Sequence, residues 1–107
     1  MDDRTLVLLT TVPNETKGRE IALNLVEKRL AACVTVSRAA RSFYRWEGRI
    51  EDAEEWILFI KTKAGLYGKI EAELKAVHPY AVPEIIALPV VAGHPAYLKW
   101  ISGETLP

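Results

Sequence analysis

The sequence predicts an α+β domain of split β-α-β topology, with elements in the order β-α-β-β-α-β and a short helix at the end. Three observations predict it. Apolar, β-branched runs and amphipathic stretches follow one another in that order, the first and third runs are the most continuously apolar, and a proline stands in the fourth. Continuous apolar runs are typical of central strands and an internal proline of an edge strand. The 107 residues fit one domain, residues 1–107.

The chain begins with a strand and a helix. Residues 5–12, "TLVLLTTV", are short, apolar and β-branched, which predicts a buried strand. Pro13 breaks this strand, and Asn14 can accept a hydrogen bond from a free backbone N–H as a helix cap. A helical stripe of apolar residues then runs through the stretch 13–31.

A long β-hairpin follows. Residues 32–46, "ACVTVSRAARSFYRW", alternate in polarity, as a strand with two different faces does. The polar stretch "EGRIED" (47–52) contains Gly48 and is predicted as the turn. Residues 54–63, "EEWILFIKTK", form the second strand, which is apolar on both faces.

The last third is predicted as a helix, a strand and a short helix. The stretch 64–79 has apolar residues at spacings of four, four and three, and Pro79 stops it. Residues 83–93 form the fourth strand, in which Pro89 cannot donate to a ladder. Residues 94–103 form the closing helix. The order is that of the ferredoxin-like fold, with the first and third strands in the centre.

Two features predict a homo-oligomer. Two helices cover only one face of a four-stranded sheet, yet the central runs "LVLL" and "WILFI" are apolar on both faces. The hairpin is also longer than the usual strand of about 5–6 residues, so we expect it to reach beyond its own subunit. Contacts through the sheet and closed by rotational symmetry would meet both requirements.

The composition of the chain limits the kinds of binding partner and the cellular compartment that we expect. The 14 basic and 14 acidic residues cancel, and we expect no nucleic-acid binding, because no Lys/Arg run is present. No apolar stretch approaches the length of a membrane span, and "MDDRTLVLLTTV" lacks the basic leader of a signal peptide. The single cysteine, Cys33, suits a reducing compartment. We therefore expect a cytoplasmic protein with no membrane contact.

Five motifs in order resemble one known family. They are "EKRLAACVTV" (27–36), "FYRWEGRIE" (43–51), "FIKTK" (59–63), "HPYAVPEIIALPV" (78–90) and "YLKWI" (97–101). Together they resemble the CutA family of divalent-cation tolerance proteins over nearly the whole chain. The resemblance implies a ferredoxin-like subunit in a tight homotrimer, with the hairpin pairing between subunits. It also implies an architecture similar to that of the trimeric PII signalling proteins.

The candidate metal ligand is His78. The resemblance implies copper ligands at positions that match Thr10, Val77 and His78, and only His78 is of a ligand type. The alternative is that His78 only ends a helix, where free carbonyls favour a cation. Cys33 reads as a small buried apolar residue. The acidic group "EDAEE" (51–55) either collects hard cations weakly or is solvated after the turn. No cofactor is expected beyond Cu(II) or another divalent cation, bound weakly.

A second candidate site is a pocket between subunits. Its predicted residues stand at strand ends, on the hairpin and in "HPYAVPEI": Lys61, Tyr80, Glu84, Tyr44 and Trp46. No G-x-S-x-G, P-loop or dinucleotide fingerprint occurs, so we expect a non-catalytic trimer tied to metal tolerance. The alternatives are a PII-like small-ligand sensor and an enzyme whose pocket holds Lys61, His78 and Glu84.

Overall fold

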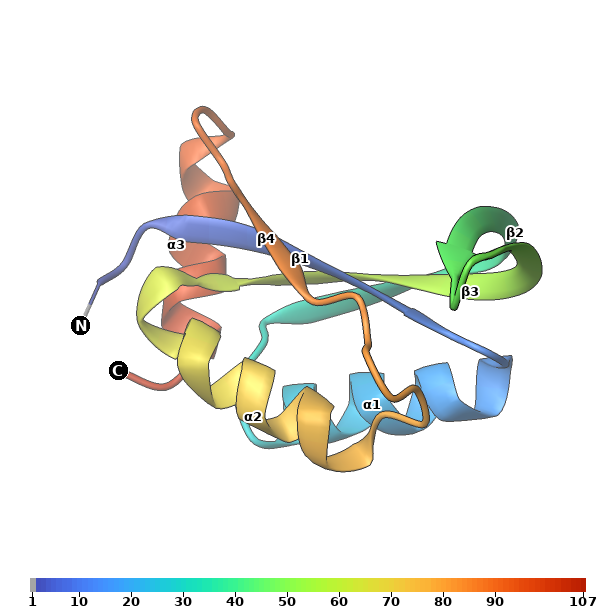
Figure 1. Cartoon of the computed structure of the whole chain (residues 1–107). Coiled ribbons are helices and arrows are strands. Elements are labelled where there is room, and N and C mark those ends of the chain that lie inside the picture. Colours follow the sequence, from blue (N-terminus) through green and yellow to red (C-terminus); the bar gives the residue numbers. More distant parts are fainter. Residues whose placement is uncertain (1) are drawn as a thin grey trace.

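The computed structural model describes residues 2–107 and contains the expected elements in the expected order (Figure 1). The strands are β1 (Thr5–Val12), β2 (Cys33–Trp46), β3 (Arg49–Lys63) and β4 (Ile86–Pro89). The helices are α1 (Glu15–Glu27), α2 (Tyr67–Val77) and α3 (Pro95–Glu104), with a 3-10 turn at Ala64–Leu66 before α2. The sheet is antiparallel throughout, in the order β2-β3-β1-β4. The central positions of β1 and β3 confirm the sequence prediction.

The turn of the long hairpin is shorter than the sequence predicts. Only Glu47 and Gly48 form it, with φ of 50° and 79°, and Arg49 already pairs with Trp46 on β2. Two consecutive positive φ angles suit the right-handed twist of a two-residue hairpin, and glycine adopts them without strain. The polar residues after the turn are strand residues on an exposed hairpin, where Asp52 pairs with Arg41 at 2.7 Å. These residues are polar because the hairpin is exposed to solvent, and not because they form a loop.

Two other elements are shorter than predicted. α1 ends at Glu27, and Arg29 adopts a φ of 58°, which lets the Leu30 N–H turn back onto the Leu25 carbonyl at 3.0 Å. β4 has only four residues, because the strand pairs with β1 just over this length and ends at Pro89. The predicted cap is confirmed: the Asn14 side chain accepts from the Lys17 N–H at 2.8 Å.

One face of the sheet carries the core. α1 and α2 lie side by side beneath this face (Figure 1). Alternate residues of the central strands meet the apolar stripes of the helices, and the fully buried side chains include Leu8, Val12, Leu58, Ile60, Leu25, Leu66, Ile70 and Leu74. Burying a side chain of this size stabilises the fold by roughly 1.5–3 kcal/mol. The core therefore forms within one chain, without side chains from a second subunit.

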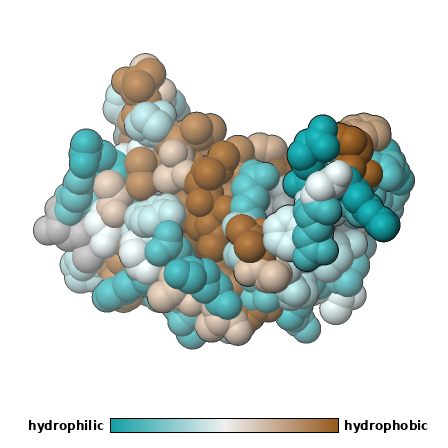
Figure 2. Space-filling view, viewed as in Figure 1, coloured by the Kyte–Doolittle hydropathy of each residue, from teal (hydrophilic) through white to brown (hydrophobic). Residues whose placement is uncertain are grey.

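The opposite face of the sheet, which we call the open face, is apolar and only partly covered. Strand alternation places these side chains on it: Val7, Leu9, Ile57, Phe59, Ile86 and Leu88. α3 covers one end, where the Lys63 Nζ donates to the Ser102 carbonyl at 3.2 Å. Leu88 remains 50% exposed. Figure 2 shows hydrophobic side chains gathered along the middle of the molecule, over β4 and β1.

Candidate functional site

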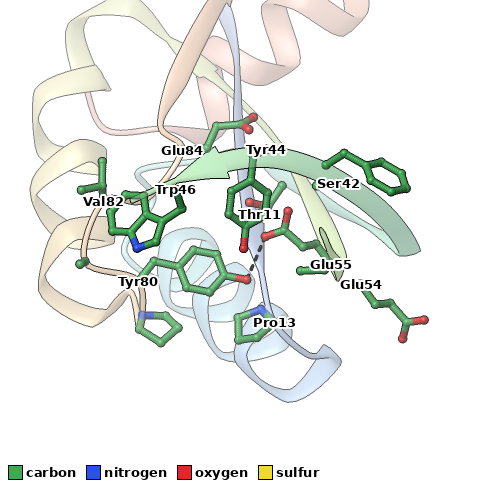
Figure 3. A pocket seen from close by; sticks show the side chains of 14 residues that line it. Thr11, Pro13, Ser42, Tyr44, Trp46, Glu54, Glu55, Tyr80, Val82 and Glu84 are labelled. Atoms are coloured by element: carbon green, nitrogen blue, oxygen red, sulfur yellow. Dashed lines mark hydrogen bonds between the residues drawn. The ribbon is translucent and has the colours of Figure 1, made fainter. Parts of the chain in front are cut away.

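A cavity of about 910 Å³ lies where the hairpin faces the connector between α2 and β4 (Figure 3). Tyr44 and Trp46 come from β2 and share a face because they are two residues apart. Glu55 comes from β3, and Tyr80 and Val82 come from the connector. Trp46 and Val82 both line the cavity and lie near one another in the view of Figure 3.

The lining of this cavity is acidic and aromatic. Three carboxylates belong to it, from Glu54, Glu55 and Glu84, together with four aromatic side chains. No Lys, Arg or His side chain lines it within residues 2–107. Since carboxylates and aromatic ring faces both carry negative potential, the cavity attracts positive charge and repels anions.

Glu55 and Tyr80 form the polar centre of the cavity. Glu55 is only 7% exposed, and its Oε2 accepts a hydrogen bond from the Tyr80 hydroxyl at 2.9 Å (Figure 3). Burial, with the adjacent Glu55 carboxylate as the second cause, raises the pKa of Tyr80 far above its usual value. The hydroxyl therefore stays protonated and donating at neutral pH. In the part of the chain that the structure describes, this is the one hydrogen bond to the Glu55 carboxylate.

His78 lies behind Tyr80, with both ring nitrogens bonded to the main chain. Nε2 lies 2.7 Å from the Thr11 carbonyl, and Nδ1 accepts from the Tyr80 N–H at 3.2 Å. Because a carbonyl can only accept, Nε2 carries the proton and the ring is neutral. Burial lowers the pKa of His78, which favours the same state. A metal ion at His78 would have to displace one of these two hydrogen bonds.

The structure brings together most of the predicted pocket residues. Four of the five line this one cavity: Tyr44, Trp46, Tyr80 and Glu84. Lys61 is not part of the lining, and its Nζ donates to the Thr35 hydroxyl at 2.6 Å on the open face. The prediction for Lys61 concerned a pocket between subunits and stays a prediction.

Glu55 is the site residue that the sequence reading missed. The group 51–55 was interpreted as a weak cation collector or as solvated charge after a turn, and solvation is wrong for Glu55. Its neighbours two and four positions on, Ile57 and Phe59, share its face of β3. The alternation of the strand, extended backwards from Phe59, places Glu55 on the open face, and its burial there follows only from the connector that crosses above it.

The residues present do not fit a tight metal site. Among residues 2–107, no three His, Cys, Asp or Glu side chains converge in a way that could hold an ion. Of the positions that match the copper ligands, Thr10 is buried and Val77 lies on the surface of α2. A hydroxyl without charge and an alkyl side chain are poor ligands for copper.

Comparisons with known proteins agree with this architecture. The model of the family described as CutA1 divalent ion tolerance protein matches residues 6–104. The divalent-cation tolerance protein CutA of Thermus thermophilus is 46% identical over 99 residues, which cover 92% of this chain and 96% of that protein. The solved structure of the Thermus thermophilus protein has a TM-score of 0.92 at 44% identity, covering 94% of this chain and 98% of that one. The solved structure of CutA1 from Oryza sativa has a TM-score of 0.94 at 37% identity, and the match covers 98% of this chain and 96% of that one.

Relatives differ in length and in compartment. The human protein CutA is 46% identical over 89% of this chain, but the matched part is only 53% of its own length. Vertebrate and plant relatives are therefore matched over about half to two thirds of their length. One plant relative is named chloroplastic, and a solved relative from Archaeoglobus fulgidus is described as periplasmic. Within residues 2–107, none of the helices combines the length and apolarity needed to cross a bilayer.

Proposed function

Because this chain belongs to the CutA1 family of divalent ion tolerance proteins, we propose that it takes part in tolerance of divalent metal ions, copper among them, by binding rather than by catalysis. We further propose that it works as a homotrimer in the cytoplasm. The single Cys33, which suits a reducing compartment, supports the location. The observation that carries the trimer is the apolar open face, which leaves side chains such as Leu88 half exposed in one chain.

The open face makes the trimer testable with a matched pair of substitutions. Leu88→Lys places a charge on the open face, where we propose that copies meet, and Leu23→Lys places one on the outer surface of α1. Both leucines are about equally exposed, at 50% and 56%, so neither change should disturb the fold of one chain. In sedimentation equilibrium we expect a trimer for the unmodified protein and for Leu23→Lys, and dissociation for Leu88→Lys. A monomer of unmodified protein at micromolar concentration would reject the trimer.

The metal proposal is weak binding at His78. Coordination there breaks one of two hydrogen bonds, at a cost of about 0.5–1.5 kcal/mol, and no group of three His, Cys, Asp or Glu side chains among residues 2–107 is arranged to hold an ion. Calorimetric titration with Cu(II), Zn(II) and Ni(II) should therefore show weak binding that His78→Asn removes. The matched control is His94→Asn, because His94 is the other histidine and stands at the start of α3. No heat with any of the three metals would reject direct binding.

A second candidate function is small-ligand sensing. The observation that favours it is the cavity that gathers Tyr44, Trp46, Tyr80 and Glu84 within one chain. An enzyme built from Lys61, His78 and Glu84 has less support, because Lys61 does not line this cavity in one chain and both His78 nitrogens are already bonded. Ligand binding that is abolished by a substitution at Tyr80 or Trp46, without turnover of the ligand, would favour the sensor.

A further inference from the structure

The charge that one chain contributes to the cavity disfavours anionic ligands. Glu54, Glu55 and Glu84 contribute three carboxylates, and no basic side chain within residues 2–107 lines the walls to offset them. A phosphate or carboxylate ligand normally meets Arg, Lys or a helix N-terminus. A nucleotide would therefore meet repulsion here without compensation. The cavity favours a ligand that carries positive charge.

Glu55 favours a ligand that donates hydrogen bonds as well as one that carries positive charge. Its side chain is 7% exposed, and Tyr80 occupies Oε2 only. The other oxygen, Oε1, has no hydrogen-bond donor or ion-pair partner within residues 2–107. A ligand that carries positive charge and N–H donors can supply the hydrogen bond that no residue within 2–107 makes to this oxygen.

The aromatic walls specify the body of the ligand. Tyr44 and Trp46 lie on one side of Tyr80 in Figure 3, and the Glu55 carboxylate lies next to the hydroxyl ends of Tyr44 and Tyr80. Aromatic faces attract cations within about 6 Å and stack with flat groups. A planar amidinium or guanidinium group satisfies both the carboxylate and the rings, because its N–H donors lie in the plane that stacks.

We propose that this cavity binds a small organic cation with N–H donors, a primary ammonium, amidinium or guanidinium group on a flat apolar body, with Glu55 as the anchoring carboxylate. Tyr80 holds that carboxylate in place through Oε2 and leaves Oε1 for the ligand. The proposal rests on the small-ligand function above and names the class of its ligand. It is independent of metal binding.

Four probes of nearly the same size test the ligand class on the purified protein. Benzamidine carries the charge and the N–H donors, benzamide is its neutral counterpart, benzoate is its anionic counterpart, and benzyltrimethylammonium has the charge without an N–H. In calorimetric titration we expect benzamidine to bind about tenfold or more tightly than each of the others, the size of one charge-assisted hydrogen bond in a desolvated site. Quenching of tryptophan fluorescence provides a second readout, since Trp46 lines the cavity.

A matched pair of substitutions tests the anchor. Glu55→Gln keeps the shape of the buried side chain and removes its charge, so benzamidine should bind about tenfold or more weakly. Glu27→Gln makes the same change at an exposed side chain at the end of α1, which does not line the cavity. We expect less than a threefold change for Glu27→Gln, and circular dichroism establishes that both variants fold.

The outcomes separate the ligand class from the ligand site. If benzamide or benzoate binds as tightly as benzamidine, the cavity is a ligand site and the cation class is wrong. Equal weakening by Glu27→Gln and Glu55→Gln would overturn Glu55 as the anchor. If no probe binds at millimolar concentration, the proposal and the sensor function both fail, whereas metal tolerance is judged by the titrations with Cu(II), Zn(II) and Ni(II).

Discussion

The hydrogen bond between Tyr80 and Glu55 leads to a quantitative stability prediction. Tyr80→Phe removes the hydroxyl that donates to Glu55 Oε2 at 2.9 Å and leaves the ring in place. A hydrogen bond to a charged group contributes about 1.5–3 kcal/mol to stability. Tyr80 is only partly buried, so water can replace some of the lost interaction, and we expect a loss at the lower end, about 1.5–2 kcal/mol. Guanidinium denaturation at pH 7 and one fixed protein concentration measures this loss.

Two controls separate the hydrogen bond from a general effect of removing a hydroxyl. Tyr44→Phe makes the same change in the same cavity, but Tyr44 is 45% exposed and its hydroxyl has no hydrogen bond within residues 2–107, so its effect should stay within about 0.5 kcal/mol. In a Glu55→Gln background the bond is neutral, so Tyr80→Phe should cost only about 0.5–1.5 kcal/mol. Equal losses from Tyr80→Phe and Tyr44→Phe, or the same loss in both backgrounds, would refute the reasoning.

Three further predictions follow from buried hydroxyls, a buried imidazole and backbone conformation. Thr10→Val should stabilise the fold by about 1 kcal/mol, because the Thr10 Oγ1 is buried without a partner among the described residues. Thr62→Val should destabilise it by about 1–3 kcal/mol, because the Thr62 hydroxyl donates to a buried carbonyl at 2.7 Å. Denaturation of both variants checks the opposite signs. Burial lowers the pKa of His78 in the folded chain, so the unfolded chain binds this proton more tightly, and stability should be lost as the pH falls through the unfolded value of 6.5 toward the lower folded value. Denaturation midpoints from about pH 7 to pH 5 should show this slope, and His78→Gln should flatten it. Gly48→Ala should destabilise the fold by about 1 kcal/mol, because φ is 79° at this position. Gly68→Ala in α2, where an added Cβ meets open space, should stabilise the fold by up to about 1 kcal/mol. A loss of stability in both variants would contradict this.

The candidate site was predictable only in part. Tyr80 and Glu84 could be chosen because strand ends near a subunit boundary are typical pocket walls, and Tyr44 and Trp46 because they offer aromatic surface, although aromatic hairpin residues more often pack between subunits. Glu55 was not chosen, because its acidic neighbours made the segment resemble a solvated turn. Whether a glutamate in such a run is buried depends on which strand lies opposite and which segment crosses above it. The residues next to Glu55 in the sequence show neither the opposite strand nor the crossing segment.

The sequence by itself determined the kinds of elements and their order. The continuous apolar runs of β1 and β3, the spacing of Leu66, Ile70 and Leu74 from the 3-10 turn into α2, and the proline in β4 act between near neighbours, so a single segment is enough to read them. Only the tertiary structure decided the chemistry of the site. Glu55 meets Tyr80 across 25 positions of the chain, and His78 meets the Thr11 carbonyl across 67. Burial, tautomer and charge arise from those distant contacts, because they depend on what the folded chain places around a group and not on its neighbours in sequence.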